Sequence, residues 1–288
     1  MTSEKGAQMG TEEAPAQRRG GARKAWPATF DTSVANQARM YDYLLGGKDN
    51  YAADREAVDA ILTIYPEMAF TARANRAFLG RAVCFLAGDA GIRQFLDIGT
   101  GIPTANNTHQ VAQAIAPESR VVYVDYDPIV LAHARALLTS DGAGATDYID
   151  ADLRDTGVIL SQAAGLLDFA KPVAVSLIAI LNAIPDDDDP HAIVATLMDA
   201  VPSGSYLALT HMASDLLDRE TQDGLEGLRD RMPKHFTSRS REEVARFFAD
   251  MDLVEPGLVR VEEWRQQPGS APDSADRSSM WCGVGRKR

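Results

Sequence analysis

Cysteine is scarce in this sequence, which has only Cys84 and Cys282 among its 288 residues. Neither lies in a CxxC pattern or in a cluster of cysteine and histidine, so no zinc site or redox motif is indicated, and we expect both thiols to be buried. Long apolar runs are lacking too. None approaches the roughly 18 residues of a membrane span, and the N-terminus lacks the apolar centre of a signal peptide. We therefore expect a cytoplasmic protein with no membrane partner and no metal site.

Basic residues are also few. The sequence has 29 Lys and Arg against 41 Asp and Glu, which gives a formal net charge of -12. A protein that binds a nucleic acid duplex needs clustered Lys and Arg to displace counterions, so we expect no nucleic acid partner. The hydrophobic content of 45% is enough for one globular domain with a full core, with or without an added cap.

The chain divides into three stretches of different character. Residues 1–28 have almost no large apolar side chains, so burial cannot offset the entropy of ordering them, and they are predicted to be a disordered tail. Residues 29–90 carry apolar side chains at helical spacing, Val58 and Ile61 among them, which predicts an N-terminal helical cap. Residues 91–288 have a different pattern and form the core.

In the core, short apolar runs alternate with helical patterns, which is typical of repeated βαβ units. Near-continuous apolar runs indicate strands that are covered on both faces. Strands are expected at 95–98, 121–124, 147–149, 173–181, 206–209, 253–259 and 280–284. Helices are expected around 104–116, 128–139, 156–168, 190–200, 213–230 and 240–250. The predicted fold class is α/β, a mostly parallel sheet with helices on both faces.

A glycine turn follows the first expected strand. Its residues are Gly99, Thr100 and Gly101, and Pro103 takes the place of the third glycine of a dinucleotide site. Such a turn lets a ligand approach the backbone closely. Asp97 would repel a pyrophosphate but suits the ammonium and sulfonium groups of S-adenosylmethionine. The sequence therefore favours S-adenosylmethionine over a nicotinamide dinucleotide; the alternative is a bare turn in which Asp97 bonds backbone amides.

Two more acidic residues follow the next two strands. Asp125, with Tyr126 beside it, is placed to accept bonds from ribose hydroxyls. Asp152 is placed to accept the exocyclic amine of adenine, and Leu153 to supply a backbone amide. Asp127 precedes a proline at the start of a helical stripe, so it is interpreted as a helix N-cap.

These features lie within longer segments that match a known family. The segments are 38–51, 72–79, 95–107, 121–138, 184–186, 204–211 and 283–287. On these residues the sequence closely resembles the actinobacterial S-adenosylmethionine-dependent methyltransferase family once catalogued as DUF574, a domain of unknown function. The resemblance implies a class I methyltransferase fold, Rossmann-like, whose seven-stranded sheet ends in an antiparallel strand. It also implies that Asp97, Gly99, Gly101, Asp125 and Asp152 form the cofactor site.

The resemblance further suggests that the N-terminal block closes over the cofactor, with Tyr41, Gly46, Lys48, Asp49 and Arg73 nearby. From the residues alone, the two glycines at 46 and 47 are a break between helices, and Lys48 with Asp49 is an exposed pair. Both interpretations stay open here.

The expected activity is methyl transfer to a small-molecule oxygen or nitrogen acceptor. His211, at the end of the fifth strand, is the candidate base, and the alternative is a histidine bonded to neighbouring loop backbone. Asn182 stands where such proteins often carry a histidine facing the acceptor, so the acceptor's identity and retained catalysis stay open. The acidic run at 186–189 favours a helix N-terminus over a metal site. A non-catalytic S-adenosylmethionine sensor is the main alternative function, and an NAD(P)-dependent oxidoreductase is the third.

Overall fold

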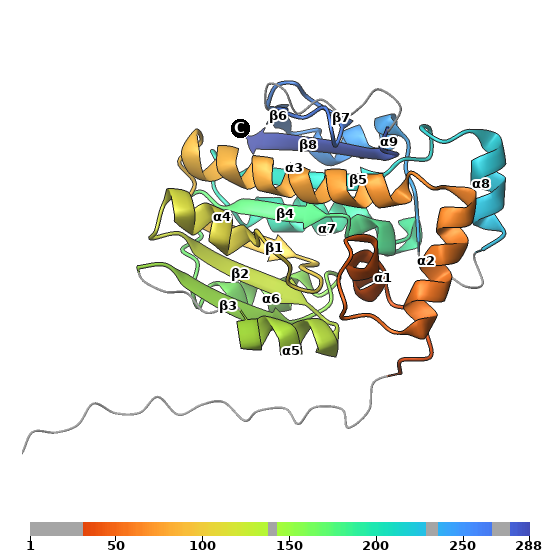
Figure 1. Cartoon of the computed structure of the whole chain (residues 1–288). Coiled ribbons are helices and arrows are strands. Elements are labelled where there is room, and N and C mark those ends of the chain that lie inside the picture. The colour runs from red at the N-terminus through yellow and green to blue at the C-terminus, as the bar shows by residue number, and fades with distance from the viewer. Residues whose placement is uncertain (1–30, 138–142, 229–235, 267–276) are drawn as a thin grey trace, which may run out of the picture. The chain divides into compact units, whose positions relative to one another are not determined.

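One mixed sheet organises the chain in the computed structural model, which describes residues 31–137, 143–228, 236–266 and 277–288 (Figure 1). The tail predicted at 1–28 lies outside these residues. The strands are β1 (Gln94–Ile98), β2 (Arg120–Asp125), β3 (Ala145–Asp150), β4 (Ala174–Ile178), β5 (Tyr206–Met212), β6 (Met251–Leu253), β7 (Val259–Arg260) and β8 (Met280–Lys287).

The strand order is β3-β2-β1-β4-β5-β8-β6, with β7 also paired to β8. The first five strands pair in parallel. β8 runs antiparallel to β5, β6 and β7. The prediction of a mostly parallel sheet with an antiparallel last strand is confirmed. The order reverses between β1 and β4, and in open α/β sheets ligands bind beyond the carboxyl ends of the strands at such a reversal.

Several sequence-based boundaries were wrong, and two of the differences are large. The single strand expected at 253–259 is two short strands, because a turn at Pro256 and Gly257 separates them and the Gly257 amide donates to the Val254 carbonyl at 2.8 Å. The helix expected at 213–230 covers only Arg219–Glu226 in the part of the chain that the structure describes, since Asp218 caps its start by accepting the Thr221 amide at 2.8 Å.

Helices cover both faces of the sheet, as predicted (Figure 1). Their bounds are α1 (Gln37–Leu44), α2 (Ala52–Ile64), α3 (Met68–Gly88), α4 (Thr108–Ile115), α5 (Pro128–Leu137), α6 (Thr156–Ala163), α7 (Pro190–Asp199), α8 (Arg219–Glu226) and α9 (Arg241–Ala245). Short 3-10 turns are η1 (Leu181–Ala183), η2 (Asp186–Asp188) and η4 (Arg246–Phe248).

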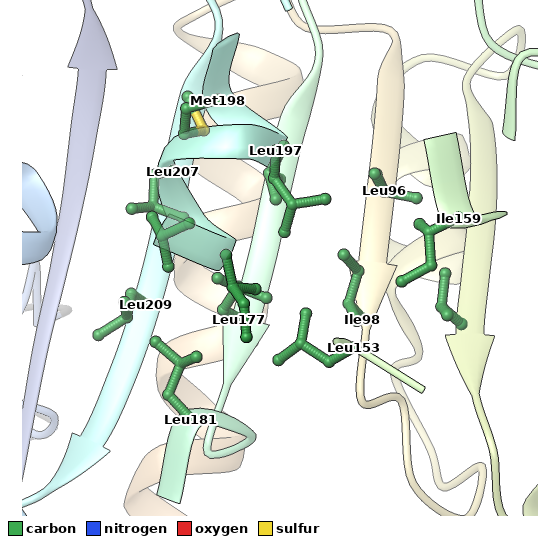
Figure 2. Close-up of a cluster of buried hydrophobic side chains, with 14 of the residues drawn as sticks. Leu96, Ile98, Leu153, Ile159, Leu177, Leu181, Leu197, Met198, Leu207 and Leu209 are labelled. Carbon is green, nitrogen blue, oxygen red and sulfur yellow. The ribbon is translucent and has the colours of Figure 1, made fainter. Parts of the chain in front are cut away.

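Alternate residues of each strand enter two different cores. On one face, Leu96 and Leu177 of the central strands pack with Ile159 of α6 and Leu197 of α7 (Figure 2). On the other face, strand residues such as Phe95 pack with α3, α4 and the segment around Trp264. Because both faces are buried, the central strands carry near-continuous apolar runs such as residues 121–124 rather than an alternating pattern.

The N-terminal helices have a small core of their own. Met40 and Leu44 of α1 pack with Val58 and Ile61 of α2 and with Ala72 at the start of α3. The later turns of the 21-residue α3 lie on the sheet instead. This one helix therefore joins the cap to the core and fixes where the cap meets the sheet.

Cys282 is buried in β8, as expected, but Cys84 is exposed on α3, so the prediction of two buried thiols was wrong for Cys84. Its position falls on the side of α3 that faces away from the apolar stripe formed by Val83, Leu86 and Ala87. No helix in the described ranges is long and apolar enough to cross a membrane.

Replacing Leu177 by Ala should lower the free energy of unfolding by about 2–5 kcal/mol, because the side chain is fully buried in the central strand β4 and its loss leaves a cavity. Denaturant unfolding followed by circular dichroism measures the change. Leu253→Ala, at a leucine that is 39% exposed, is the matched control and should cost less than about 1 kcal/mol. Equal losses would contradict the described core.

Candidate cofactor site

The glycine turn lies where the ends of β1, β2 and β4 meet. Gly99 has a φ of +75° and donates its amide to the Val124 carbonyl at 2.8 Å. A Cβ at Gly99 would come within 2.5 Å of the Ile180 side chain, so the turn is packed tightly against the segment that follows β4. Thr100 donates its hydroxyl to the carbonyl of Asp97 at 3.2 Å. The turn is held by backbone contacts that only glycine permits at this point.

Asp97 is a buried carboxylate at the end of β1, with 5% of its surface exposed. Its Oδ2 accepts the Thr108 hydroxyl, from the first turn of α4, at 2.6 Å. Burial raises the pKa of Asp97 to about 6, and the Thr108 bond and the charge of Arg76 oppose this shift. A carboxylate held in this way keeps its charge at neutral pH and is ready to pair with a cation.

Asp125, at the end of β2, binds the glycine turn directly. Its Oδ2 accepts the Gly101 amide and its Oδ1 accepts the Asp127 amide, both at 2.9 Å. Burial raises the pKa of Asp125, and these backbone bonds oppose the rise. Tyr126, the next residue, is 58% exposed at the same strand end. The Asp125 carboxylate thus fixes the turn from the neighbouring strand.

Asp127 is the N-cap that the sequence predicted. Its Oδ1 accepts the Ile129 amide in the first turn of α5 at 2.7 Å. Its Oδ2 accepts the Asn36 side-chain amide at 2.6 Å, and Asn36 in turn caps α1 by accepting the Ala38 amide. One carboxylate therefore starts a core helix and also ties the cap to the edge of the cofactor site.

Asp152 follows β3 and completes the row of three acidic strand ends. It forms an ion pair with Arg154 at 2.9 Å, and Arg154 pairs with Asp188 at 2.7 Å. Leu153 points its side chain into the core, where it is 4% exposed. Of the acidic run at 186–189, Asp189 caps α7 by accepting the Ala192 amide, as the sequence predicted. Among the described residues, no group of His, Cys, Asp and Glu is arranged to hold a metal ion.

The N-terminal residues that the resemblance placed near the cofactor lie in α1, in the loop after it and in α3. The Tyr41 hydroxyl donates to the Ala72 carbonyl at 3.0 Å. Gly46 has a φ of +79° in the loop after α1, whereas Lys48 and Asp49 in the same loop are exposed, like Arg73 on α3. Asp49 lies 3.9 Å from His133 of α5, which places this loop beside the core.

The loop is folded around Asp42. The Asp42 carboxylate accepts the Asp49 amide at 2.9 Å and the Asn50 side chain at 2.8 Å. A Cβ at Gly47 would lie 2.0 Å from this carboxylate, so only glycine fits there. The break between helices that the sequence indicated is thus an ordered loop with a buried acid at its centre.

His211 and Asn182 are buried, and both have structural hydrogen-bond partners. The Nδ1 of His211 bonds the Met212 carbonyl at 2.9 Å, and its Nε2 lies 2.7 Å from Arg239. Burial lowers the pKa of His211 to about 4, so the ring is neutral at pH 7. Asn182 accepts the Met212 amide at 3.1 Å. These contacts favour the alternative interpretation of His211, a histidine bonded to its surroundings.

Sequence reasoning missed several residues that the fold brings to this edge. Gln37 of α1 donates to the Ala179 carbonyl, just after β4, at 3.2 Å. Asn75 and Arg76 of α3 lie near Tyr41 and Asp97. One signal was present: Asn75 interrupts the apolar inward stripe of α3, and a polar residue on a buried stripe needs a partner.

Comparisons with known proteins agree with this geometry. Residues 23–288 match a family described as S-adenosyl methyltransferase. The chain is similar to a DUF574 family protein from Streptomyces avermitilis MA-4680, with 45% identity and a TM-score of 0.85 over 90% of this chain and 99% of that one. It is also similar to a candidate methyltransferase from Thermobifida fusca YX, with 40% identity and a TM-score of 0.81 over 92% and 100% of the two chains. No curated protein matches the sequence.

The chain has the mostly parallel, Rossmann-like α/β fold that the resemblance to class I methyltransferases implied. The protein belongs to the S-adenosyl methyltransferase family, formerly catalogued as DUF574, and S-adenosylmethionine is its cofactor. The resemblance stated from the sequence is confirmed.

Gly99→Ala should lower the free energy of unfolding by about 1–3 kcal/mol, because it combines a left-handed φ with a clash against Ile180. Gly101→Ala is the matched control: its φ is +65°, but no atom lies within 4 Å of a Cβ there. It should therefore lose only about 1 kcal/mol. Thermal and urea unfolding of the ligand-free variants measure both losses of stability. Equal losses would argue against the close packing of Ile180 on Gly99.

Asp97→Asn should raise the free energy of unfolding at pH 7.5 by roughly 1–3 kcal/mol, since the amide keeps an acceptor for Thr108 and removes a buried charge. The folded protein holds the proton up to about pH 6 and the unfolded chain only up to the usual 3.8. Asp97 therefore destabilises the native state progressively as pH rises from about 4 to 6.

Urea unfolding of both proteins across pH 4–8 checks this sign. The advantage of the variant should be small near pH 4 and complete above pH 6. A difference in stability that does not vary with pH would show that the Asp97 carboxylate carries no such penalty.

Proposed function

We propose that the protein transfers the methyl group of S-adenosylmethionine to an oxygen or nitrogen of a small molecule. The observation that supports this most is the row of Asp97, Asp125 and Asp152 at the carboxyl ends of three adjacent parallel strands, beside the glycine turn. Neighbouring strands lie about 4.8 Å apart, and Asp97 pairs with Tyr123, two residues before Asp125, so the row also advances along the strands. It is therefore longer than about 10 Å, on the scale of an extended nucleoside with an attached amino acid.

Each acidic residue has a different proposed role along the row. Asp97 would pair with the ammonium of the amino acid, since its buried carboxylate lacks a cation of its own at bonding distance in the described structure. Asp125 would accept the ribose hydroxyls, and Tyr126 would lie against the base. Asp152 would accept the exocyclic amine of adenine beside the Leu153 amide, sharing its carboxylate with Arg154.

The N-terminal block is proposed to cover the bound cofactor, with Tyr41, Gly46, Lys48 and Asp49 nearby. Two bonds support this placement. Asn36 reaches Asp127 at 2.6 Å, two residues beyond the proposed ribose ligand, and Gln37 reaches the Ala179 carbonyl after β4. The start of α1 is thereby held between the ends of β2 and β4.

When bound, S-adenosylmethionine would supply a methyl group attached to a sulfonium. The acceptor's lone pair would form the new bond to the methyl carbon, while the electrons of the broken carbon–sulfur bond stay on sulfur. The protein's part is then to align the acceptor and exclude water. His211 is neutral and bonded at both nitrogens, so the proposal relies on alignment rather than on this histidine as base. The net charge of -12 disfavours a nucleic acid as acceptor and supports a small molecule.

Turnover tests the proposal. The protein is incubated with S-adenosylmethionine carrying a labelled methyl group and with libraries of small hydroxyl and amine compounds, and labelled products are separated from the cofactor. Calorimetry with S-adenosylmethionine, S-adenosylhomocysteine and NAD runs beside it. Label in a small molecule supports the proposal. Binding of the sulfur ligands without transfer to any acceptor would favour a sensor, and binding of NAD alone would overturn it.

Asp125→Ala should weaken S-adenosylmethionine binding by roughly 1–3 kcal/mol, because ribose hydroxyls and the Gly101 amide lose their acceptor. Calorimetry measures the dissociation constant. Asp147→Ala, at an exposed aspartate on β3, is the control and should bind normally. Unchanged affinity in Asp125→Ala would remove this residue from the proposed site.

A further inference from the structure

Asn75 Oδ1, Arg76 Nε and Ser176 Oγ are among the buried polar atoms that lack a hydrogen-bond partner in the described part of the chain. Asn75 is 1% exposed and Ser176 is fully buried. An unpaired buried polar atom costs about 1–3 kcal/mol, so a group of them needs an explanation. A molecule bound at this place would supply such partners.

The three residues converge on one side of the β1 end. Ser176 of β4 is the direct cross-strand neighbour of Asp97, and in a parallel pair such neighbours point to the same face. That face is covered by α3 and α4, because Phe95, two residues before Asp97, packs against them. Asn75 and Arg76 come from α3, so they approach Asp97 from above this face.

Further bonds fix both α3 residues toward the site. The Asn75 side chain donates to the Tyr41 hydroxyl at 2.9 Å, which leaves its Oδ1 as a free acceptor. Arg76 donates from Nη2 to the Ala105 carbonyl at 2.9 Å and to Asn107 at 3.1 Å, the residue before Thr108. Thr108 itself bonds Asp97. The guanidinium is therefore anchored at one end, and its Nε–H is left without an acceptor.

The charges here suit a zwitterion. An arginine N–H that lacks an acceptor can donate a hydrogen bond to a carboxylate. Hydrogen bonds from a charged guanidinium to a carboxylate are stronger than those from neutral donors. An amide oxygen beside a buried carboxylate matches an ammonium, which has three donors to place. A free amino acid group has an ammonium and a carboxylate attached to the same carbon, and the amino acid end of the cofactor is such a group.

We infer that Arg76 binds the carboxylate of the amino acid part of S-adenosylmethionine, while Asn75 Oδ1 and Asp97 receive its ammonium. The inference rests on the proposed cofactor site and adds the residues that select the amino acid end. It assigns the carboxylate to Arg76 and not to Arg73, which lies exposed one turn earlier on α3. The charge of Arg76 also favours the ionised form of Asp97, lowering the pKa that burial raises.

A series of three ligands separates this role from a structural one. S-adenosylmethionine has a carboxylate, an ammonium and a sulfonium, decarboxylated S-adenosylmethionine lacks only the carboxylate, and 5′-methylthioadenosine has none of the three. Dissociation constants are measured by calorimetry for the full-length wild type and for Arg76→Ala, Arg73→Ala and Asp97→Asn.

Arg76→Ala should weaken S-adenosylmethionine binding roughly 10–100-fold, the usual effect of losing a charged hydrogen bond, and should change the affinity for the other two ligands less than about twofold. Asp97→Asn should weaken both ligands that carry the ammonium and spare 5′-methylthioadenosine. Arg73→Ala tests the competing assignment and should not show a loss that is selective for S-adenosylmethionine. Normal 5′-methylthioadenosine binding also shows that a variant is folded.

Three outcomes would overturn the inference. Equal losses for all three ligands in Arg76→Ala would mean that Arg76 only anchors the loop at 105–107. A selective loss in Arg73→Ala with none in Arg76→Ala would assign the carboxylate to Arg73. Unchanged S-adenosylmethionine binding in Arg76→Ala would remove Arg76 from the site. If the wild type binds none of the ligands, the proposed function itself fails, and this result is distinct from the other three.

Discussion

The burial of the Asp97 carboxylate at the end of β1 is the constraint on which the site depends. A carboxylate that is 5% exposed and lies between neighbouring strands loses most of its hydration. The Thr108 hydroxyl and the nearby charge of Arg76 offset part of this loss. The remainder is a cost to the fold that a bound cation can relieve. Stability and ligand binding therefore oppose each other at this residue.

The other contacts of the site keep that carboxylate in place. Asp125 binds the glycine turn from β2, and Ile180 packs against Gly99 from the far side, so the turn is fixed from two directions. Asp127, two residues after Asp125, accepts a hydrogen bond from Asn36 and so connects this turn to the start of α1. Because these bonds join residues that are distant in sequence, the N-terminal helices and the sheet edge are held together as one structure.

The sequence predicted the architecture well where a local pattern had one physical meaning. Apolar runs bounded by helices predicted the parallel sheet, and the two glycines after the first run predicted the tight turn at the end of β1. The Asp127 N-cap followed from the proline beside it. Predictions failed where a local pattern allowed two outcomes. The apolar stretch at 253–259 contains a proline and a glycine that divide it into two strands. Cys84 lies on a helix, and composition alone did not define which side of that helix is exposed.

The sequence by itself determined the fold class, the family and the acidic residues at the ends of β1, β2 and β3, because periodicity and short motifs are local properties of the chain. Only the tertiary structure decided which side chains meet across long separations. It placed Arg76 rather than Arg73 near Asp97, joined Asn36 to Asp127 and gave His211 two partners. Such pairings depend on how strands are ordered and how α3 lies across them, and no pattern along the chain records this.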